Sequence, residues 1–349
     1  MSVLKCAPVD RSTPHPLKIG LFLPHVAGFM DGATARWTDL LAMAEHAAAV
    51  GFDSLWLVDH FWYQPTPIRG DILKGLGLPA PPEAAPGEPL GVWEAWSLLA
   101  ALAAAVPRVE LGTIVTCTGY RNPALLAKMA DTVEEVSGGR LILGLGAGDS
   151  AFEHRVFGYP FDHRVGRFEE ALTIIRALLR EGQCDFAGTY YQVRDCALRP
   201  RGPRRHGPPI LIGSLAVGQR MLRLTVEQAD LWNAWLATGR SLPDVLPPVL
   251  DAVDRACVEH GRDPSTLGRT VAVRVSLSEQ AIPGSDFIRG STDPSAAPIR
   301  GSVDEIADVL GAFARLGISH LQVVLLPSTR AGIEAFAPVL ARLDRTRPS

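Results

Sequence analysis

Hydrophobic and polar positions change period along the whole chain. Short runs that are apolar throughout alternate with longer stretches in which apolar residues recur at helical spacing. The runs predict eight strands, at 18–23, 54–58, 109–115, 141–145, 209–212, 231–235, 270–276 and 320–325. The stretches between them predict eight helices, at 36–50, 92–105, 124–136, 166–180, 219–227, 245–260, 303–316 and 333–343.

Each predicted strand is followed by its own helix, and the strands do not alternate between apolar and polar residues. Strands of this kind are buried on both faces, as in a parallel sheet. Eight strand–helix units in 349 residues favour a closed (β/α)₈ TIM barrel over an open doubly wound sheet. We therefore expect a single α/β barrel domain over residues 17–349, preceded by a polar tail at 1–16.

Three insertions interrupt this alternation, after the second, fourth and seventh βα strands, at 62–91, 181–208 and 277–301. The second contains DFAGTYYQV at 185–193, which predicts a hairpin that turns at Gly188. The first and third follow strand carboxyl ends, where barrel enzymes carry their active sites. They are either lids and substrate walls or inert surface insertions.

Composition narrows the classes of protein. Hydrophobic residues make up 47% of the chain and charged residues 20%, which is enough apolar surface for a large core. The net charge is −3 with both signs intermixed, so we do not expect nucleic acid as a partner. The sequence shows no signal peptide and no apolar run long enough for a membrane span, so we expect a cytoplasmic protein. Five cysteines without C-x-x-C spacing predict neither a disulfide framework nor a metal site: Cys6, Cys117, Cys184, Cys196 and Cys257.

The carboxyl end of the second predicted strand carries the first candidate for chemistry. His60 can accept or donate a proton near neutral pH. Asp59 precedes it, but neighbouring residues of a strand face opposite ways, so we do not expect the two side chains to pair. The alternative for His60 is a structural side chain with satisfied hydrogen bonds.

A glycine run, GLGAGD at 144–149, follows the fourth predicted strand. Gly146 and Gly148 would let backbone approach a planar or phosphorylated ligand, although the interior of a barrel also favours small residues. Asp149 is a candidate acid or base, with a turn residue as the alternative. The run is not the dinucleotide-binding fingerprint, because its third glycine falls one residue early and we expect no helix directly after it.

Other candidates lie near the same face. Gly213 and Ser214 could cradle a phosphate, or form an ordinary turn with a capping serine. Aromatic side chains could stack on a ring or wall a substrate pocket, or serve as plain packing: Trp62, Tyr63 and Trp235. Two arginines of DHRVGRFEE could contact an anionic group or be surface charges: Arg164 and Arg167.

Four blocks together resemble the bacterial luciferase-like superfamily. They are GFDSLWLVDHF at 51–61, LGTIVTCTGYRNPALLAKMADTVEEVSGGRLILGLGAGD at 111–149, GYPFDHRVGRFEEALTIIRALL at 158–179 followed by F-x-G-x-Y-Y at 186–191, and PPILIGS at 208–214. The resemblance implies a (β/α)₈ barrel that binds FMN or the deazaflavin coenzyme F420 at the strand carboxyl ends. It is strongest from residue 17 to 235.

The resemblance also implies roles for particular positions. His60, in a D/E-H motif with Asp59, would lie against the cofactor ring. A bulge after the third strand, often with a cis peptide, would back the ring and corresponds to Ile114 and Val115. Thr116 and Cys117 follow that bulge beside the ring. Gly146, Gly148, Gly213 and Ser214 match positions that approach the cofactor and its phosphate.

The local sequence is most similar to the deazaflavin-dependent branch of this superfamily, in which a carboxylate after the fourth strand takes part in proton transfer. Asp149 matches that position. Lysines that bind a sugar phosphate in some members are not matched, since none follows Lys128. We expect an F420-dependent oxidoreductase that transfers a hydride between the deazaflavin and a small organic substrate, as a homodimer. The alternatives are an FMN-dependent monooxygenase that uses O₂ and, from another class, a barrel without catalytic activity.

Overall fold

The computed structural model describes residues 17–63, 88–214, 218–237, 241–277 and 298–344. The expected tail at 1–16 lies outside these residues, as do most of the first insertion and most of the third.

Eight parallel strands close into a barrel. They run in the order β10-β11-β12-β13-β1-β2-β5-β7, and a further pairing of β10 with β7 closes the circle. The strands are β1 (Lys18–Phe22), β2 (Ser54–Leu57), β5 (Glu110–Thr113), β7 (Leu141–Gly146), β10 (Ile210–Gly213), β11 (Leu231–Trp235), β12 (Gly268–Ser276) and β13 (His320–Leu326). The expected (β/α)₈ barrel is confirmed, with strand bounds within a few residues of those predicted.

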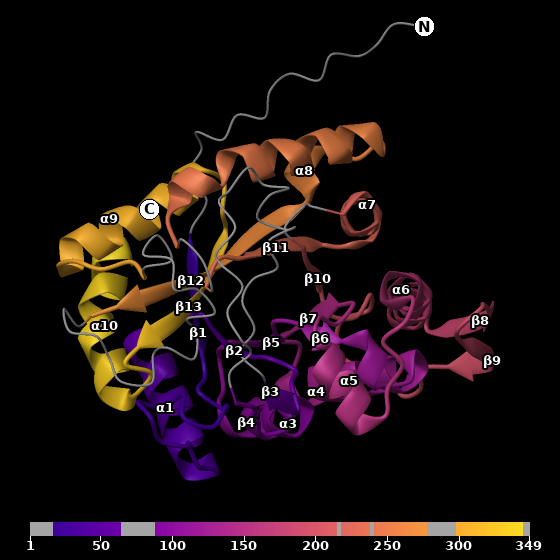
Figure 1. The fold of residues 1–349 in the computed structure, drawn as a ribbon, viewed down its shortest axis with the longest axis horizontal. Helices are drawn as coiled ribbons and strands as arrows, with labels where there is room; N and C mark the ends of the chain where they lie inside the picture. The colour runs from indigo at the N-terminus through magenta and orange to yellow at the C-terminus, as the bar shows by residue number, and fades with distance from the viewer. Residues whose placement is uncertain (1–16, 64–87, 215–217, 238–240, 278–297, 345–349) are drawn as a thin grey trace, which may run out of the picture.

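Helices surround the barrel (Figure 1). The helices that follow the eight strands are α1 (Trp37–Val50), α3 (Ala95–Ala105), α4 (Pro123–Ser137), α6 (Arg164–Glu181), α7 (Gln219–Gln228), α8 (Pro247–Glu259), α9 (Val303–Arg315) and α10 (Arg330–Asp344). Their ends follow local rules: Asn122 caps the first N–H groups of α4, and Gly138 ends that helix in the left-handed conformation.

A buried tryptophan fills the barrel interior beneath the mouth, which is the end of the barrel where the strand carboxyl ends meet. Trp56 of β2 is fully buried, and a Cβ atom at Gly112 of β5 would lie 2.3 Å from its ring. The indole Nε1 donates to Ser54 Oγ, 2.7 Å away. Glycine on the neighbouring strand therefore makes room for this large side chain in the barrel interior.

The first insertion is described only at its two ends, whereas the second is described throughout. β3 (Trp62–Tyr63) pairs with β4 (Leu90–Gly91) at the two ends of the first insertion. In the second, β8 (Gln183–Ala187) and β9 (Gln192–Ala197) form the predicted hairpin around Gly188. The third lies largely in 278–297, outside the described residues.

The structure adds an element that the sequence did not predict. Helix α5 (Ala151–Phe157) starts directly after the glycine run, where we expected no helix. The Ser150 side chain caps it by accepting from the N–H of Glu153, 3.2 Å away. A second short strand, β6 (Thr116–Cys117), pairs with β7 beyond the end of β5.

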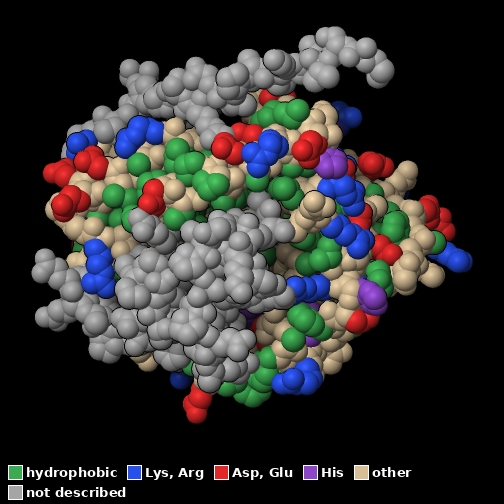
Figure 2. All heavy atoms as spheres, turned by 45° about the horizontal axis from the view of Figure 1, so that its top comes forward, with side chains coloured by type: hydrophobic (Ala, Val, Ile, Leu, Met, Phe, Trp, Pro, Cys, Tyr) green, Lys and Arg blue, Asp and Glu red, His purple; other side chains and the backbone are tan. Residues whose placement is uncertain are grey.

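The surface of the described part is mixed in charge. On the face in Figure 2, acidic and basic side chains are interspersed, in keeping with their intermixing along the sequence. No helix of the described residues is long and apolar enough to cross a membrane.

Candidate active site

The strand carboxyl ends bring the predicted site residues to one end of the barrel. Asp59 and His60 follow β2, Thr116 and Cys117 form β6, and Gly146 ends β7. Gly213 ends β10, and Trp235 ends β11. This convergence is a property of parallel barrels, in which all strand carboxyl ends meet at one mouth.

The main polar contact of the mouth joins His60 to Glu153 of α5. His60 Nδ1 lies 2.6 Å from Glu153 Oε2, and the carboxylate is fully buried whereas the imidazole is 18% exposed. Glu153 Oε1 also accepts from the backbone N–H groups of Phe61 and Trp62, at 2.7 and 3.0 Å. The carboxylate thereby fixes both the His60 ring and the chain that follows it.

Charge at this pair sets the protonation of His60. Burial alone lowers the pKa of the imidazole, but the hydrogen bond that His60 donates to Glu153 and the negative charges of Asp149, Glu153 and Asp59 outweigh it and raise the pKa to about 9. Burial raises the pKa of Glu153, and its contact with His60 together with the two backbone N–H groups lowers it overall. At neutral pH the pair is therefore an imidazolium beside a carboxylate.

Asp59 does not pair with His60, as the alternation along the strand predicted. It is buried and binds the Arg121 guanidinium through both oxygens, at 2.6 and 2.9 Å. It also accepts from the backbone N–H of Cys117, 3.1 Å away. Arg121 contacts Glu94 at 2.7 Å as well, so this buried ion pair ties the end of β2 to β6 and to the start of α3.

The predicted bulge after the third barrel strand is present, and the peptide bond between Ile114 and Val115 is cis. The glycines around it have the packing role that was the alternative to ligand approach. A Cβ atom at Gly146 would lie 2.5 Å from Val115 Cγ2, and one at Gly213 would lie 3.2 Å from Val115 Cγ1. Part of the glycine pattern therefore accommodates the bulge itself.

Cys117 and His154 lie beneath Gly148. Cys117 Sγ is 3.8 Å from His154 Nε2, and both side chains are buried. His154 Nδ1 lies 2.8 Å from the Ser150 carbonyl, so Nδ1 donates and Nε2 accepts from the thiol. A Cβ atom at Gly148 would lie 2.7 Å from the sulfur, so glycine there lets the chain pass close to this pair.

The remaining predicted residues differ in their surroundings. Asp149 is exposed and acts on His60 through its charge, with no hydrogen bond between them among the described residues. The Tyr63 ring lies 5.2 Å from the His60 ring, whereas Trp62 is 39% exposed and packs on Phe152. Trp235 lies edge-on to Phe22, 6.3 Å away.

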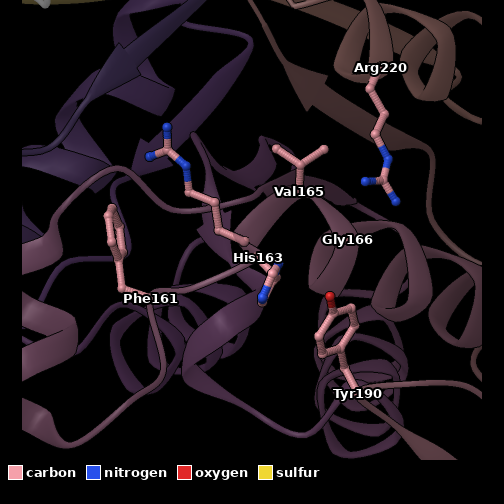
Figure 3. A pocket seen from close by; sticks show the side chains of 7 residues that line it. Phe161, His163, Val165, Gly166, Tyr190 and Arg220 are labelled. Carbon is pink, nitrogen blue, oxygen red and sulfur yellow. The ribbon is translucent and has the colours of Figure 1, made fainter.

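A pocket of about 330 Å³ lies at the start of α6. Figure 3 shows His163 and Gly166 at the amino end of this helix, Tyr190 from the β8–β9 turn and Arg220 from α7. Arg164 also lines the pocket and donates to the Gly148 carbonyl, 3.1 Å away, so the pocket adjoins the glycine run of the mouth. Arg167 instead contacts Asp162 and packs on Tyr190.

The electrostatics of this pocket favour binding of an anion. His163, the N-cap of α6, makes no side-chain capping bond, and the first turn of this 18-residue helix has no acidic residue. Its first backbone N–H groups thus carry the positive end of the helix dipole. Arg164 and Arg220 add cationic side chains, although Arg220 also pairs with Glu169.

Glu153 is the functional candidate that the sequence analysis missed. Its signal was present: Ser150 and Glu153 form the S-x-x-E pattern that marks a helix start. Reading that pattern would have placed a short helix at the mouth with a carboxylate on its first turn. Among the described residues, no group of three or more His, Cys, Asp or Glu side chains could hold a metal ion.

Comparisons with known proteins found relatives in sequence and in fold. A phthiodiolone/phenolphthiodiolone dimycocerosates ketoreductase of Mycobacterium kansasii is 30% identical over 297 residues, covering 76% of this chain and 75% of that protein. The pyrimidine monooxygenase RutA of Methylorubrum extorquens is 27% identical, over 72% of this chain and 74% of its own. An F420-dependent secondary alcohol dehydrogenase, solved with an F420-acetone adduct, has the same fold, with a TM-score of 0.72, 21% identity and coverage of 94% of this chain and 99% of its own.

The family model described as luciferase-like monooxygenase matches residues 17–281. That range includes seven of the eight barrel strands, the His60–Glu153 pair and the glycine run. The chain is an enzyme of the luciferase-like monooxygenase family of oxidoreductases and monooxygenases.

Proposed function

We propose that this enzyme transfers a hydride between coenzyme F420 and a ketone or the corresponding secondary alcohol. The observation that carries the proposal is the His60–Glu153 pair, which holds a protonated imidazole at the barrel mouth. When bound, the deazaflavin supplies or accepts the hydride, and the protein has to orient the partners and move one proton.

His60 is suited to the proton step. Its Nδ1 atom is engaged with Glu153, whereas Nε2 has no hydrogen-bond partner among the described residues. Because the ring is protonated at neutral pH, Nε2–H can donate to a carbonyl oxygen as negative charge develops there. In the opposite direction the neutral imidazole accepts the proton of the alcohol. Asp149 contributes the negative charge that supports the imidazolium.

Two similar proteins support the substrate class. The Mycobacterium kansasii relative is named as a ketoreductase, and the structural neighbour is an F420-dependent secondary alcohol dehydrogenase that holds an acetone adduct. Both names describe interconversion of a ketone and a secondary alcohol. A protonated histidine at the mouth meets the requirement of ketone reduction for a general acid.

The remaining mouth residues would hold the cofactor. Ile114, Val115, Thr116 and Cys117 would back its ring, and the glycine run would let the ring approach the backbone. The basic pocket at the start of α6 would receive the acidic tail, because Arg164 reaches both the pocket and the Gly148 carbonyl. FMN and F420 both carry a phosphate on this tail, so the pocket fits either one.

An FMN-dependent monooxygenase is the second candidate. The RutA relative and the description of the family model favour it. In that reaction His60 would stand beside reduced flavin and O₂, and the same mouth residues would exclude water.

A side-by-side titration with F420, FMN and FAD, followed by fluorescence, distinguishes the two candidates. The proposal expects micromolar binding of F420, and oxidation of reduced F420 only when a ketone is added. His60→Ala should bind F420 normally and lose about 100-fold or more in turnover. Tight binding of FMN alone, with oxygen uptake, would establish the monooxygenase instead.

The pocket has its own test. Arg164→Ala should weaken F420 binding about tenfold, yet leave binding of the deazaflavin chromophore without its phosphate-bearing tail unchanged. Arg255→Ala, which removes an exposed arginine of α8, is the matched control and should leave both affinities unchanged. An equal loss for both ligands in Arg164→Ala would place the tail elsewhere.

A further inference from the structure

Two cysteines face each other in the β8–β9 hairpin. Cys184 of β8 is the direct register partner of Cys196 of β9 in this antiparallel pair, and both are free thiols. The hairpin extends beyond α6 at the edge of the molecule (Figure 1). This pair of thiols has no part in the proposed hydride transfer.

The register places both thiols on the same side of the hairpin. Side chains of directly opposed residues in an antiparallel pair leave the sheet on one face, and their Cα atoms are about 4.5–5.5 Å apart. That separation lies inside the range of about 4.4–6.8 Å that disulfides span. Both cysteines pack against the main hydrophobic cluster, as do Phe186 and Val193 of the same hairpin. Two thiols on one face at this Cα spacing are within reach of a disulfide.

The two thiols differ in access. Cys184 is buried, with 9% of its surface exposed, whereas Cys196 is only partly buried. Burial and the nearby Cys196 and Asp185 raise the pKa of Cys184. A soluble oxidant therefore meets Cys196 first, and Cys184 is positioned to react second from the protein side.

We propose that Cys184 and Cys196 form a redox-active dithiol that a small disulfide such as oxidised glutathione converts reversibly to a cross-strand disulfide. The Cys196 thiolate attacks one sulfur of the oxidant, and one glutathione thiolate leaves. The Cys184 thiolate then attacks Cys196 Sγ in the mixed disulfide, and the second glutathione thiolate leaves. Two protein thiols are oxidised, one oxidised glutathione is reduced to two glutathiones, and the two thiol protons pass to the glutathione thiolates.

The position of the crosslink defines its structural effect. The tip of the hairpin is already held by Glu170 of α6, which accepts from the backbone N–H groups of Thr189, Tyr190 and Tyr191. The disulfide would join the two strands to each other near the base of the hairpin. Since it closes a loop within one chain, it restricts the unfolded state, and the oxidised protein should melt a few degrees higher than the reduced protein.

The test uses the full chain, reduced and then exposed to oxidised glutathione. We expect the oxidised protein to lose two titratable thiols and to have a mass lower by two hydrogens. Peptide mapping should find a peptide that joins Cys184 to Cys196, and dithiothreitol should reverse all of these changes. Cys196→Ser and Cys184→Ser should each fail to form this crosslink and to gain thermal stability on oxidation. Cys257→Ser, which removes a buried thiol on α8, should behave as the parent protein does.

Either of two results would overturn the proposal. One is retention of both thiols in the parent protein at an excess of oxidant at which a glutathione adduct forms elsewhere. The other is a crosslinked peptide that joins a different pair of cysteines. Peptide mapping of the parent protein gives this answer even if Cys184→Ser, at the buried position, does not fold.

Discussion

Glu153 Oε2 and His60 Nδ1 lie 2.6 Å apart although the residues are separated by 93 positions in the chain. The barrel brings them together because β2 ends at the mouth and α5 begins there. The fully buried carboxylate keeps the partly exposed imidazole protonated at neutral pH. The chemistry that follows from this contact can be tested through its pH dependence.

Replacing Glu153 with glutamine should shift the pH profile of ketone reduction. Glutamine keeps an acceptor for the Phe61 and Trp62 N–H groups but removes the charge that raises the pKa of His60. Reduction needs protonated His60, so the parent rate should fall as the pH rises through about 9. In Glu153→Gln the fall should come at lower pH, and kcat at pH 8 should be about tenfold or more below that of the parent.

The measurement is kcat for oxidation of reduced F420 by a ketone between pH 6 and pH 10. F420 affinity serves as the control and should be the same in both proteins. A variant that is slower by one constant factor at every pH would contradict the proton-donor role of His60. Glu153 would then have only a structural role.

The Asp59–Arg121 pair should matter for stability. Asp59 is fully buried and Arg121 is 9% exposed, so removing the carboxylate charge leaves a buried cation without its main partner. Asp59→Asn should lower the free energy of unfolding by about 3 kcal/mol or more. The comparison is Glu110→Gln, which breaks an ion pair whose partners are 49% and 31% exposed and should cost under about 1 kcal/mol. Urea unfolding measures both, and equal losses would contradict this account.

Gly146→Ala tests the packing role of the glycine run. The added methyl group would meet Val115 Cγ2 at 2.5 Å, so we expect a loss of about 1–3 kcal/mol in the free energy of unfolding. Adding Val115→Ala should restore part of that loss, because it removes the atom in conflict. Gly91→Ala, where nothing lies within 4 Å of the new Cβ atom, is the control for a glycine replacement. If the double variant is as unstable as both single losses added together, the contact with Val115 is not the cause.

The sequence was sufficient for the barrel because its signals are local and repeated. Fully apolar runs such as 141–145 and capped helices such as α4 each predict their own element, and eight units predict closure. The positions at the strand ends, including His60 and Cys117, followed from the same pattern. The β8–β9 hairpin was predicted from the glycine at its turn.

The contacts between those positions could not be predicted in the same way. The partner of Asp59 is Arg121 on the loop after β6, and the partner of His60 is Glu153 on a helix of seven residues. Both contacts depend on how neighbouring units of the barrel meet, which no local pattern records. The role of Gly146 likewise depends on the side chain of Val115, in the bulge between β5 and β6.

Because of His320, we expect the free energy of unfolding to fall in acid. It is buried below the mouth, with Nε2 2.7 Å from Ser54 Oγ, and burial together with the Lys18 charge lowers its pKa to about 3. An unfolded histidine titrates near pH 6.5, so the stabilisation is fully present above that pH and is lost as the pH falls toward 3. Between pH 7 and pH 5 the loss should be about 2 kcal/mol from this residue alone.

His320→Asn should weaken the pH dependence of urea unfolding by that amount, and His206→Asn, at an exposed position, should leave it unchanged. An unaltered pH dependence in His320→Asn would mean that another buried group, such as His25, accounts for the acid sensitivity.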